Sequence, residues 1–282
     1  MSASVETFAE GLIWPEGLRW REGSLWFSDA FSGKVWRALG SGAREIVVEI
    51  DGRPSGLGFL PDGRLLVVEM TSGRVFRVDD GRPSVYCDLS ALTPHNCNDM
   101  LVLASGRAYV GEFGYDWIGG AEPQSAVLMT IDEAGVPAVT ARDVEFPNGI
   151  VLTADGRSLL VAESTASRIT AFDLASDGGL SNRRIWGEHP GFLDGLCLDS
   201  AGGLWIATHS ACAFVRMEEG GLITDRVDVS GRWALDCVLG GPHGTTLYMA
   251  TCENDGQHFE ASIGRVEAVE VQRPGPSAGQ PS

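Results

Sequence analysis

A pattern of short apolar strands separated by glycine-containing turns recurs six times along this chain of 282 residues. The first residue of each copy is here called the opener; it is small or polar in five copies and leucine in the sixth. An apolar strand, a turn with glycine and a second apolar strand follow, as in PSGLGFLPDGRLLVVE at residues 54–69. The openers follow one another at spacings of 39, 43, 50, 46 and 41 residues, and they are Glu16, Ser55, Asn98, Asn148, Asp194 and Leu235.

A repeat of this length built from short strands is typical of a β-propeller, in which four-stranded blades surround a central channel. Repeats of paired helices have a similar length, but they would show apolar residues three and four positions apart, and these segments do not. The sequence therefore predicts an all-β fold, a six-bladed β-propeller that forms one domain over residues 1–271. The tail, residues 272–282, is rich in Pro, Gly and Ser and is expected to be disordered.

The composition excludes several classes of protein. The chain has 21 Lys and Arg residues against 38 Asp and Glu, a net charge of −17, whereas nucleic-acid binding needs a basic surface. No apolar run approaches the roughly 20 residues of a membrane span, and the N-terminus lacks the features of a signal peptide. We expect a cytoplasmic protein with no membrane or nucleic-acid partner and with six reduced cysteines. The oligomeric state stays open.

The openers predict a metal site in the channel. The strand after each opener should lie innermost in its blade, so the openers should meet at one mouth of the channel. Glu16, Asn98, Asn148 and Asp194 would then place two carboxylates and two amides around the axis. One such residue before glycine indicates only a turn, but charges buried together need a cation to offset them. Oxygen ligands favour one divalent cation, first Ca²⁺, with Mg²⁺, Mn²⁺, zinc or iron as alternatives.

The second strands should end at the same mouth. Their last residues, or the residues just after them, are Asp29, Glu69, Glu112, Glu163, His209 and Glu253. We interpret the acids as solvated or hydrogen-bonded groups with structural roles. His209 is interpreted either as a structural rim residue or as an alternative general base, because an ordinary imidazole titrates near neutral pH.

Several segments of the chain resemble the SMP-30/gluconolactonase/LRE-like family: WPEGLRW, NCNDMLV, GRAYVGEF, FPNGIVLTADGRSLLVAES, LSNRRIW and LDGLCLDSAGGLWIAT. The resemblance runs from about residue 11 to residue 255. It implies a six-bladed propeller with a divalent cation in the channel and lactonase activity. It also implies that Glu16, Asn148 and Asp194 bind the cation, that Asn98 contacts substrate or metal-bound water, and that Asp194 is the general base.

Two features depart from the sugar lactonases of that family. Asn96 stands where those relatives carry a substrate-binding arginine, and the long loop at residues 112–126 is rich in aromatic side chains. We therefore expect a small or moderately sized lactone with some apolar character. The residues expected to contact substrate are Asn96, Asn98, Tyr115, Asp116 and His209.

The sequence thus predicts a metal-dependent hydrolase that opens a lactone by attack of metal-activated water, with Asp194 as its catalytic residue. The partner is a small-molecule lactone or ester. Two alternatives stay open. The same pocket could cleave a phosphotriester or catalyse a non-hydrolytic reaction on an apolar substrate, or the propeller could bind a ligand without catalysis. The chain has no H-E-x-x-H or P-loop motif, and its G-x-S-x-G match, GPSAG at residues 275–279, lies in the Pro-, Gly- and Ser-rich tail and is no nucleophile elbow between a strand and a helix.

Overall fold

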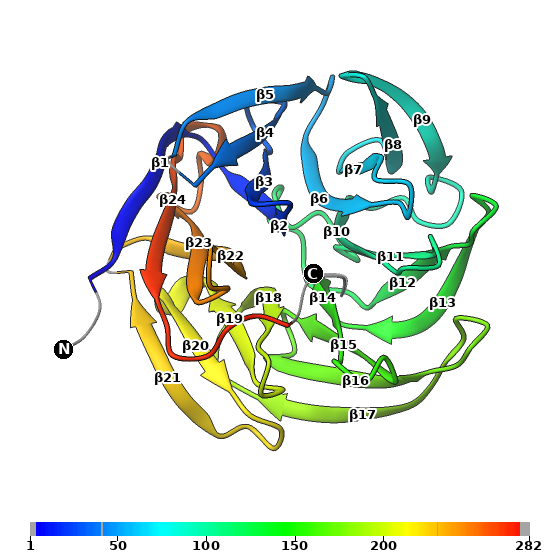
Figure 1. Ribbon diagram of the computed structural model, residues 1–282. Helices are drawn as coiled ribbons and strands as arrows, with labels where there is room; N and C mark the ends of the chain where they lie inside the picture. Colours follow the sequence, from blue (N-terminus) through cyan, green and yellow to red (C-terminus); the bar gives the residue numbers. More distant parts are fainter. Residues whose placement is uncertain (1–3, 41, 230, 277–282) are drawn as a thin grey trace.

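The computed structural model describes residues 4–40, 42–229 and 231–276, in which 24 strands form six four-stranded antiparallel sheets around a ring (Figure 1). This confirms the predicted six-bladed propeller. Blade 1 contains β2 (Pro15–Arg21), β3 (Ser24–Asp29), β4 (Lys34–Leu39) and β5 (Arg44–Glu49). Blade 2 contains β6 (Pro54–Phe59), β7 (Leu65–Glu69), β8 (Arg74–Asp79) and β9 (Arg82–Asp88). Blade 3 contains β10 (Cys97–Val102), β11 (Ala108–Glu112), β12 (Ala126–Ile131) and β13 (Pro137–Val144). Blade 4 contains β14 (Pro147–Leu152), β15 (Ser158–Glu163), β16 (Arg168–Leu174) and β17 (Leu180–Glu188). Blade 5 contains β18 (Leu193–Leu198), β19 (Leu204–Thr208), β20 (Ala213–Met217) and β21 (Ile223–Asp228). Blade 6 contains β22 (Trp233–Gly240), β23 (Thr246–Glu253), β24 (Ile263–Glu270) and β1 (Glu6–Leu12).

The ring closes by pairing the first strand with the last. Strand β1 pairs antiparallel with β24 and completes blade 6 as its outermost strand (Figure 1). The sequence repeat did not reveal this closure, because the repeated unit starts at the opener and β1 precedes the first opener. Two 3₁₀ turns, η1 (His209–Ala211) and η2 (Phe259–Ala261), lie in the loops of blades 5 and 6. No helix in the described part of the chain is long and apolar enough to cross a membrane.

The tail that was expected to be disordered begins with a described segment. In residues 272–276, the Arg273 guanidinium pairs with Asp225 at 3.1 Å, and the Pro274 carbonyl accepts a hydrogen bond from the Ser200 amide at 2.8 Å. The Gly275 amide donates to a turn of blade 6. These contacts hold the segment against blades 5 and 6. Residues 277–282 lie outside the described residues.

An irregularity in strand pairing marks the opener in each of the six inner hairpins. In blade 1 the register shifts between Glu16 and Arg19, and equivalent shifts occur in the other five blades. Such bulges re-aim side chains. In four blades a glycine follows the opener; a Cβ at Gly17 would lie 2.6 Å from the carbonyl oxygen of Ser55 in blade 2. Glycine is therefore required there, because neighbouring inner strands approach so closely.

Apolar side chains of the described residues form six clusters that each join two adjacent blades. A seventh cluster lies at the mouth where the openers gather, and it contains Met70, Phe113, Tyr115 and Phe146, with Trp117, Ile118 and Phe192 packed against them. The ring is thus stabilised by contacts between blades, whereas the seventh cluster belongs to a pocket.

Candidate functional site

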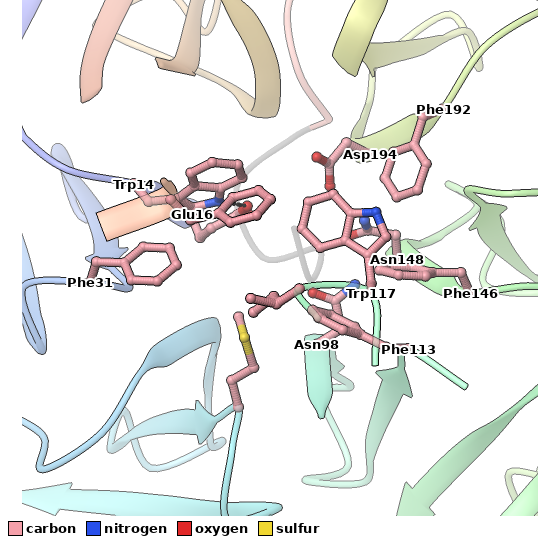
Figure 2. Close-up of a pocket in the computed structure, with 13 residues that line it drawn as sticks. Trp14, Glu16, Phe31, Asn98, Phe113, Trp117, Phe146, Asn148, Phe192 and Asp194 are labelled. Atoms are coloured by element: carbon pink, nitrogen blue, oxygen red, sulfur yellow. Dashed lines mark hydrogen bonds between the residues drawn. The ribbon is translucent and has the colours of Figure 1, made fainter. Parts of the chain in front are cut away.

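Four openers line one pocket at the mouth of the channel. Figure 2 shows their polar groups pointing into the same space from four different blades: Glu16 on β2, Asn98 on β10, Asn148 on β14 and Asp194 on β18. The two amides and Asp194 are buried, and Glu16 is partly buried. The structure therefore brings together every residue that the sequence assigned to the metal site.

The two carboxylates of the pocket have no cationic side chain to neutralise them. Burial raises the pKa of Asp194 well above its usual range, and the negative charge of Glu16 raises it further, although a hydrogen bond from Asn148 opposes the shift in part. Burial also raises the pKa of Glu16, whose carboxylate accepts a hydrogen bond from the Trp14 indole at 2.9 Å. No Lys or Arg is among the thirteen residues that line the pocket. Two negative charges here call for a counter-ion.

The donor set fits a hard divalent cation. The amide nitrogen of Asn98 donates to the Pro147 carbonyl at 3.5 Å, and that of Asn148 donates to the Ser164 hydroxyl at 3.3 Å. These bonds leave the amide oxygens for a ligand, beside two carboxylates. In the described residues no group of three or more His, Cys, Asp or Glu side chains is arranged to hold a metal. The set of two acids and two amides is therefore typical of Ca²⁺ or Mg²⁺ rather than of a thiolate or imidazole site.

A buried ion cluster crosses the channel below the pocket. Arg19, three residues beyond Glu16 on β2, forms an ion pair with Asp99 on β10 at 2.8 Å and lies 4.0 Å from Asp236 on β22. Asp236 also accepts hydrogen bonds from the backbone amides of Leu18, at 2.6 Å, and of the residue that follows it. Burial and the charge of Asp99 raise the pKa of Asp236 to about 7. This cluster of Arg19, Asp99 and Asp236 joins blades 1, 3 and 6 beneath the four polar openers.

The walls of the pocket are apolar. Besides the four polar openers, the lining consists of Trp14, Phe31, Met70, Phe113, Trp117, Ile118, Phe146, Phe192 and Phe259. The rings contact one another: the centroids of Phe113 and Phe146 are 4.5 Å apart, and those of Trp117 and Phe259 are 5.1 Å apart. These side chains come from loops of all six blades, so a polar floor lies beneath an aromatic wall (Figure 2).

Of the five residues expected to contact substrate, Asn98 lines the pocket and the other four do not. Asn96 is partly buried, and its carbonyl accepts a hydrogen bond from the Phe113 amide. Tyr115 is buried against Phe146 at 5.9 Å. Asp116 is exposed and accepts a hydrogen bond from the amide of a loop glycine. The contacts of these residues with substrate stay a prediction.

His209 lies in an aromatic cage beside the pocket. Its ring centroid is 4.2 Å from Trp233 and 5.2 Å from Phe192, and its buried Nε2 has no hydrogen-bond partner among the described residues. Burial lowers the pKa of His209 to about 3, so its imidazole is neutral and a weak proton acceptor near pH 7. Between the two residues considered as general base, these surroundings favour Asp194.

The acids at the ends of the second strands hold the loops of the mouth. Four of them are buried: Asp29, Glu69, Glu112 and Glu163. Asp29 accepts a hydrogen bond from the Trp14 backbone amide at 2.7 Å, and Glu163 accepts one from the Glu145 amide at 2.8 Å, next to Phe146. Their carboxylates therefore fix the loops that present the aromatic wall, which agrees with the structural role expected for them.

Sequence reasoning missed most of the aromatic wall, although the repeat contained a signal for part of it. Three of the wall residues stand two positions before an opener: Trp14, Phe146 and Phe192. Asn96 occupies the equivalent position in blade 3. Aligning the copies on their openers would have shown an aromatic residue two positions before three of the four polar openers that line the pocket. Phe31 and Phe259 come from loops without a shared register, and nothing in the repeat marks them.

Comparison with known proteins assigns the chain to a family. The family model of the SMP-30/Gluconolactonase/LRE-like region matches residues 14–253. The pentonolactonase XacC of Haloferax volcanii is 29% identical over 206 residues, 72% of this chain and 68% of that protein. Seven further curated relatives are matched over 41–59% of their own lengths, and lactonases are among them.

Solved structures share the fold at lower identity. A luciferin-regenerating enzyme matches with a TM-score of 0.85 and 18% identity over 99% of this chain and 98% of its own. A gluconolactonase from Xanthomonas campestris matches with a TM-score of 0.76 and 21% identity over 96% of this chain and 90% of its own. At these identities the structures support the architecture alone. The family match covers most of the chain, and the protein therefore belongs to the SMP-30/gluconolactonase/LRE-like family.

Proposed function

We propose that this protein is a divalent-cation-dependent lactonase. The observation that carries the proposal is the pair of carboxylates, Glu16 and Asp194, which lie with two amides on the floor of an apolar pocket without a cationic side chain. Relatives named as lactonases support the same class of reaction. A pure scaffold would gain nothing from two carboxyl groups whose pKa values burial raises, because the buried charges destabilise it.

Each floor residue has a separate task in this proposal. A divalent cation held by Glu16, Asn98, Asn148 and Asp194 would polarise the ester carbonyl and lower the pKa of a water. Asp194 accepts the proton of the attacking water as the water oxygen bonds to the carbonyl carbon. When the ring C–O bond breaks, Asp194 returns this proton to the ring oxygen, which leaves as a hydroxyl. The Asn98 amide orients the carbonyl group, and the aromatic wall excludes bulk water.

Removing the cation tests this proposal directly. Protein treated with EDTA and dialysed is expected to lose hydrolysis of a panel of δ-lactones by at least about 100-fold, because the carbonyl is no longer polarised. Adding Ca²⁺, Mg²⁺ or Mn²⁺ should restore the rate, measured by pH-stat titration of the released acid. Unchanged activity after chelation would contradict the metal requirement. Cation binding without turnover of any lactone would favour the binding-only alternative.

Cation affinity is expected to rise with pH. Burial raises the pKa values of both Glu16 and Asp194, so the metal-free folded protein holds protons that the unfolded chain has already released. The stability that these protons provide is complete below the ordinary carboxyl pKa and is lost as the pH rises through the raised values. A cation replaces the protons, so its binding releases them. Isothermal titration with Ca²⁺ from about pH 5 to about pH 8 should show tighter binding at each step and proton release in buffers of different ionisation enthalpy. An affinity independent of pH would show that the carboxyls are already ionised.

A further inference from the structure

We propose that the pocket selects uncharged lactones that carry a flat apolar substituent, and that Trp117 contacts that substituent. This inference rests on the proposed lactonase function and names its substrate class. It is carried by the division of the pocket into a floor of four polar openers and a wall of nine apolar residues. The ester group would lie on the floor, and the substituent would extend along the wall.

The wall offers no partners for a hydroxylated substrate. The polar side chains of the lining are the four floor residues, and these are engaged by the cation and the ester. Each sugar hydroxyl buried against the wall would lose its hydrogen bonds to water and gain no partner in exchange. An apolar substituent is stabilised in proportion to the apolar area that the wall removes from water. The same wall therefore rejects a sugar lactone and favours an apolar one.

The pocket also disfavours anionic substrates. Glu16 and Asp194 already place two carboxylates on its floor, and its lining contains no cationic side chain. The guanidinium of Arg53 lies near the mouth, 4.7 Å from the centre of the Phe31 ring, but it does not line the pocket. The two floor carboxylates balance the charge of a bound divalent cation, so a carboxylate or phosphate group on the substituent would lie against the wall without a counter-ion.

Trp117 occupies the place where the substituent must lie. The space left among the lining side chains is about 30 Å³, which holds about two water molecules and no lactone. Trp117 stands on the loop after β11 and crosses the pocket to contact rings from three other blades: Phe146, Phe192 and Phe259. It is partly exposed and comes from a loop, whereas Phe146 is buried. Rotation of Trp117 would open the pocket.

The stacking of Trp117 indicates the shape of the substituent. The rings of Trp117 and Phe192 are stacked at 5.8 Å with an interplanar angle of 23°. A flat group between these two rings would replace the contact of Trp117 with Phe192 by two contacts, one with each ring. Aromatic contacts stabilise a complex beyond the burial of area alone. A planar substituent is therefore favoured over a branched one of equal volume.

Four lactones that share a six-membered ester ring test the proposal: δ-valerolactone, δ-nonalactone, 6-phenyl-δ-valerolactone and glucono-δ-lactone. For each, kcat/KM of the cation-loaded protein is divided by the spontaneous hydrolysis rate at the same pH, which removes differences in intrinsic reactivity. The normalised value for the phenyl compound is expected to exceed that for δ-valerolactone by about 10- to 200-fold. It should also exceed the values for δ-nonalactone and for glucono-δ-lactone.

Variants of Trp117 connect the preference to the wall. For each variant, the normalised kcat/KM for the phenyl compound is divided by that for δ-valerolactone. Trp117→Ala should lower this ratio by about tenfold, whereas Trp117→Phe should keep most of it. Trp36→Ala is the matched control, because Trp36 lies on β4 outside the pocket, and its ratio should equal that of the parent. Equal normalised rates for the four compounds, or a preference for glucono-δ-lactone, would overturn the substrate class and leave the lactonase proposal standing. If no lactone is hydrolysed, the lactonase proposal fails, and this inference fails with it.

Discussion

Asp194→Asn is expected to abolish lactone hydrolysis and, in the metal-free protein, to raise the melting temperature. The substitution keeps the shape of the side chain but removes the proposed base and one proposed negative ligand of the cation, so kcat/KM should fall by about 10³-fold or more. The stabilisation has a separate cause. Burial and the charge of Glu16 raise the pKa of Asp194, so above that pKa the ionised carboxylate destabilises the fold. Each kcal/mol of relieved repulsion should raise the melting temperature by about 2–4 °C.

The sign of the stability change distinguishes this case from the ordinary loss of a buried polar group. The matched control is Asp29→Asn, because Asp29 is also buried at the mouth but accepts hydrogen bonds from the backbone amides of Ile13 and Trp14. That variant should melt at a lower temperature than the parent. Differential scanning calorimetry in EDTA at about pH 8 and about pH 5 provides the measurement, and the advantage of Asp194→Asn should shrink at the lower pH. Retained activity would exclude Asp194 from catalysis, and a lower melting temperature in EDTA would show that its carboxylate is already satisfied.

Arg19→Met is expected to be the most damaging single substitution in the channel. It removes the cation between Asp99 and Asp236 and leaves two buried carboxylates unpaired, which should cost about 3–5 kcal/mol of unfolding free energy. Arg19 lies below the floor and does not line the pocket. The variant should therefore weaken cation binding only to the extent that it lowers the stability of the fold. Urea unfolding followed by tryptophan fluorescence measures the loss.

Two further variants test the origin of this effect. Arg19→Met combined with Asp99→Asn should recover part of the stability, because one of the two unpaired charges is gone. Arg64→Met removes a surface partner of Asp62, whose side chain is 49% exposed, and should cost less than about 1 kcal/mol. Equal costs for Arg19→Met and Arg64→Met would mean that the channel cluster is solvated.

The spacing of the openers was sufficient to predict the fold and the floor of the pocket. A repeat of six short-strand units has few other solutions, and residues in equivalent positions of a ring must face the same axis. Glu16 and Asp194 are 178 residues apart in sequence, yet their register alone placed them together. The fold and the floor were thus encoded in a periodic signal.

The cluster below the floor was not predicted, because it depends on exceptions to that period. The residue after the opener is glycine in four blades, but it is Asp99 in blade 3 and Asp236 in blade 6. These two acids fill the space that glycine leaves elsewhere, and Arg19 lies between them. A lone arginine in a strand looks like an ordinary exposed residue, and its partners are 80 and 217 residues away, so no local pattern indicates the contact.

The pairing of β1 with β24 has a consequence for how the molecule assembles. During synthesis β1 emerges before the other described strands, but its partner β24 is the last of these strands to leave the ribosome. The five complete blades can pack successively on their neighbours, whereas joining the two ends requires contacts across nearly the whole chain, which form slowly. Glu16 on the first blade and Asp194 on the fifth then acquire their final spacing only when β1 pairs with β24 and closes the ring. The binding of a cation that we propose at the floor therefore requires the finished ring.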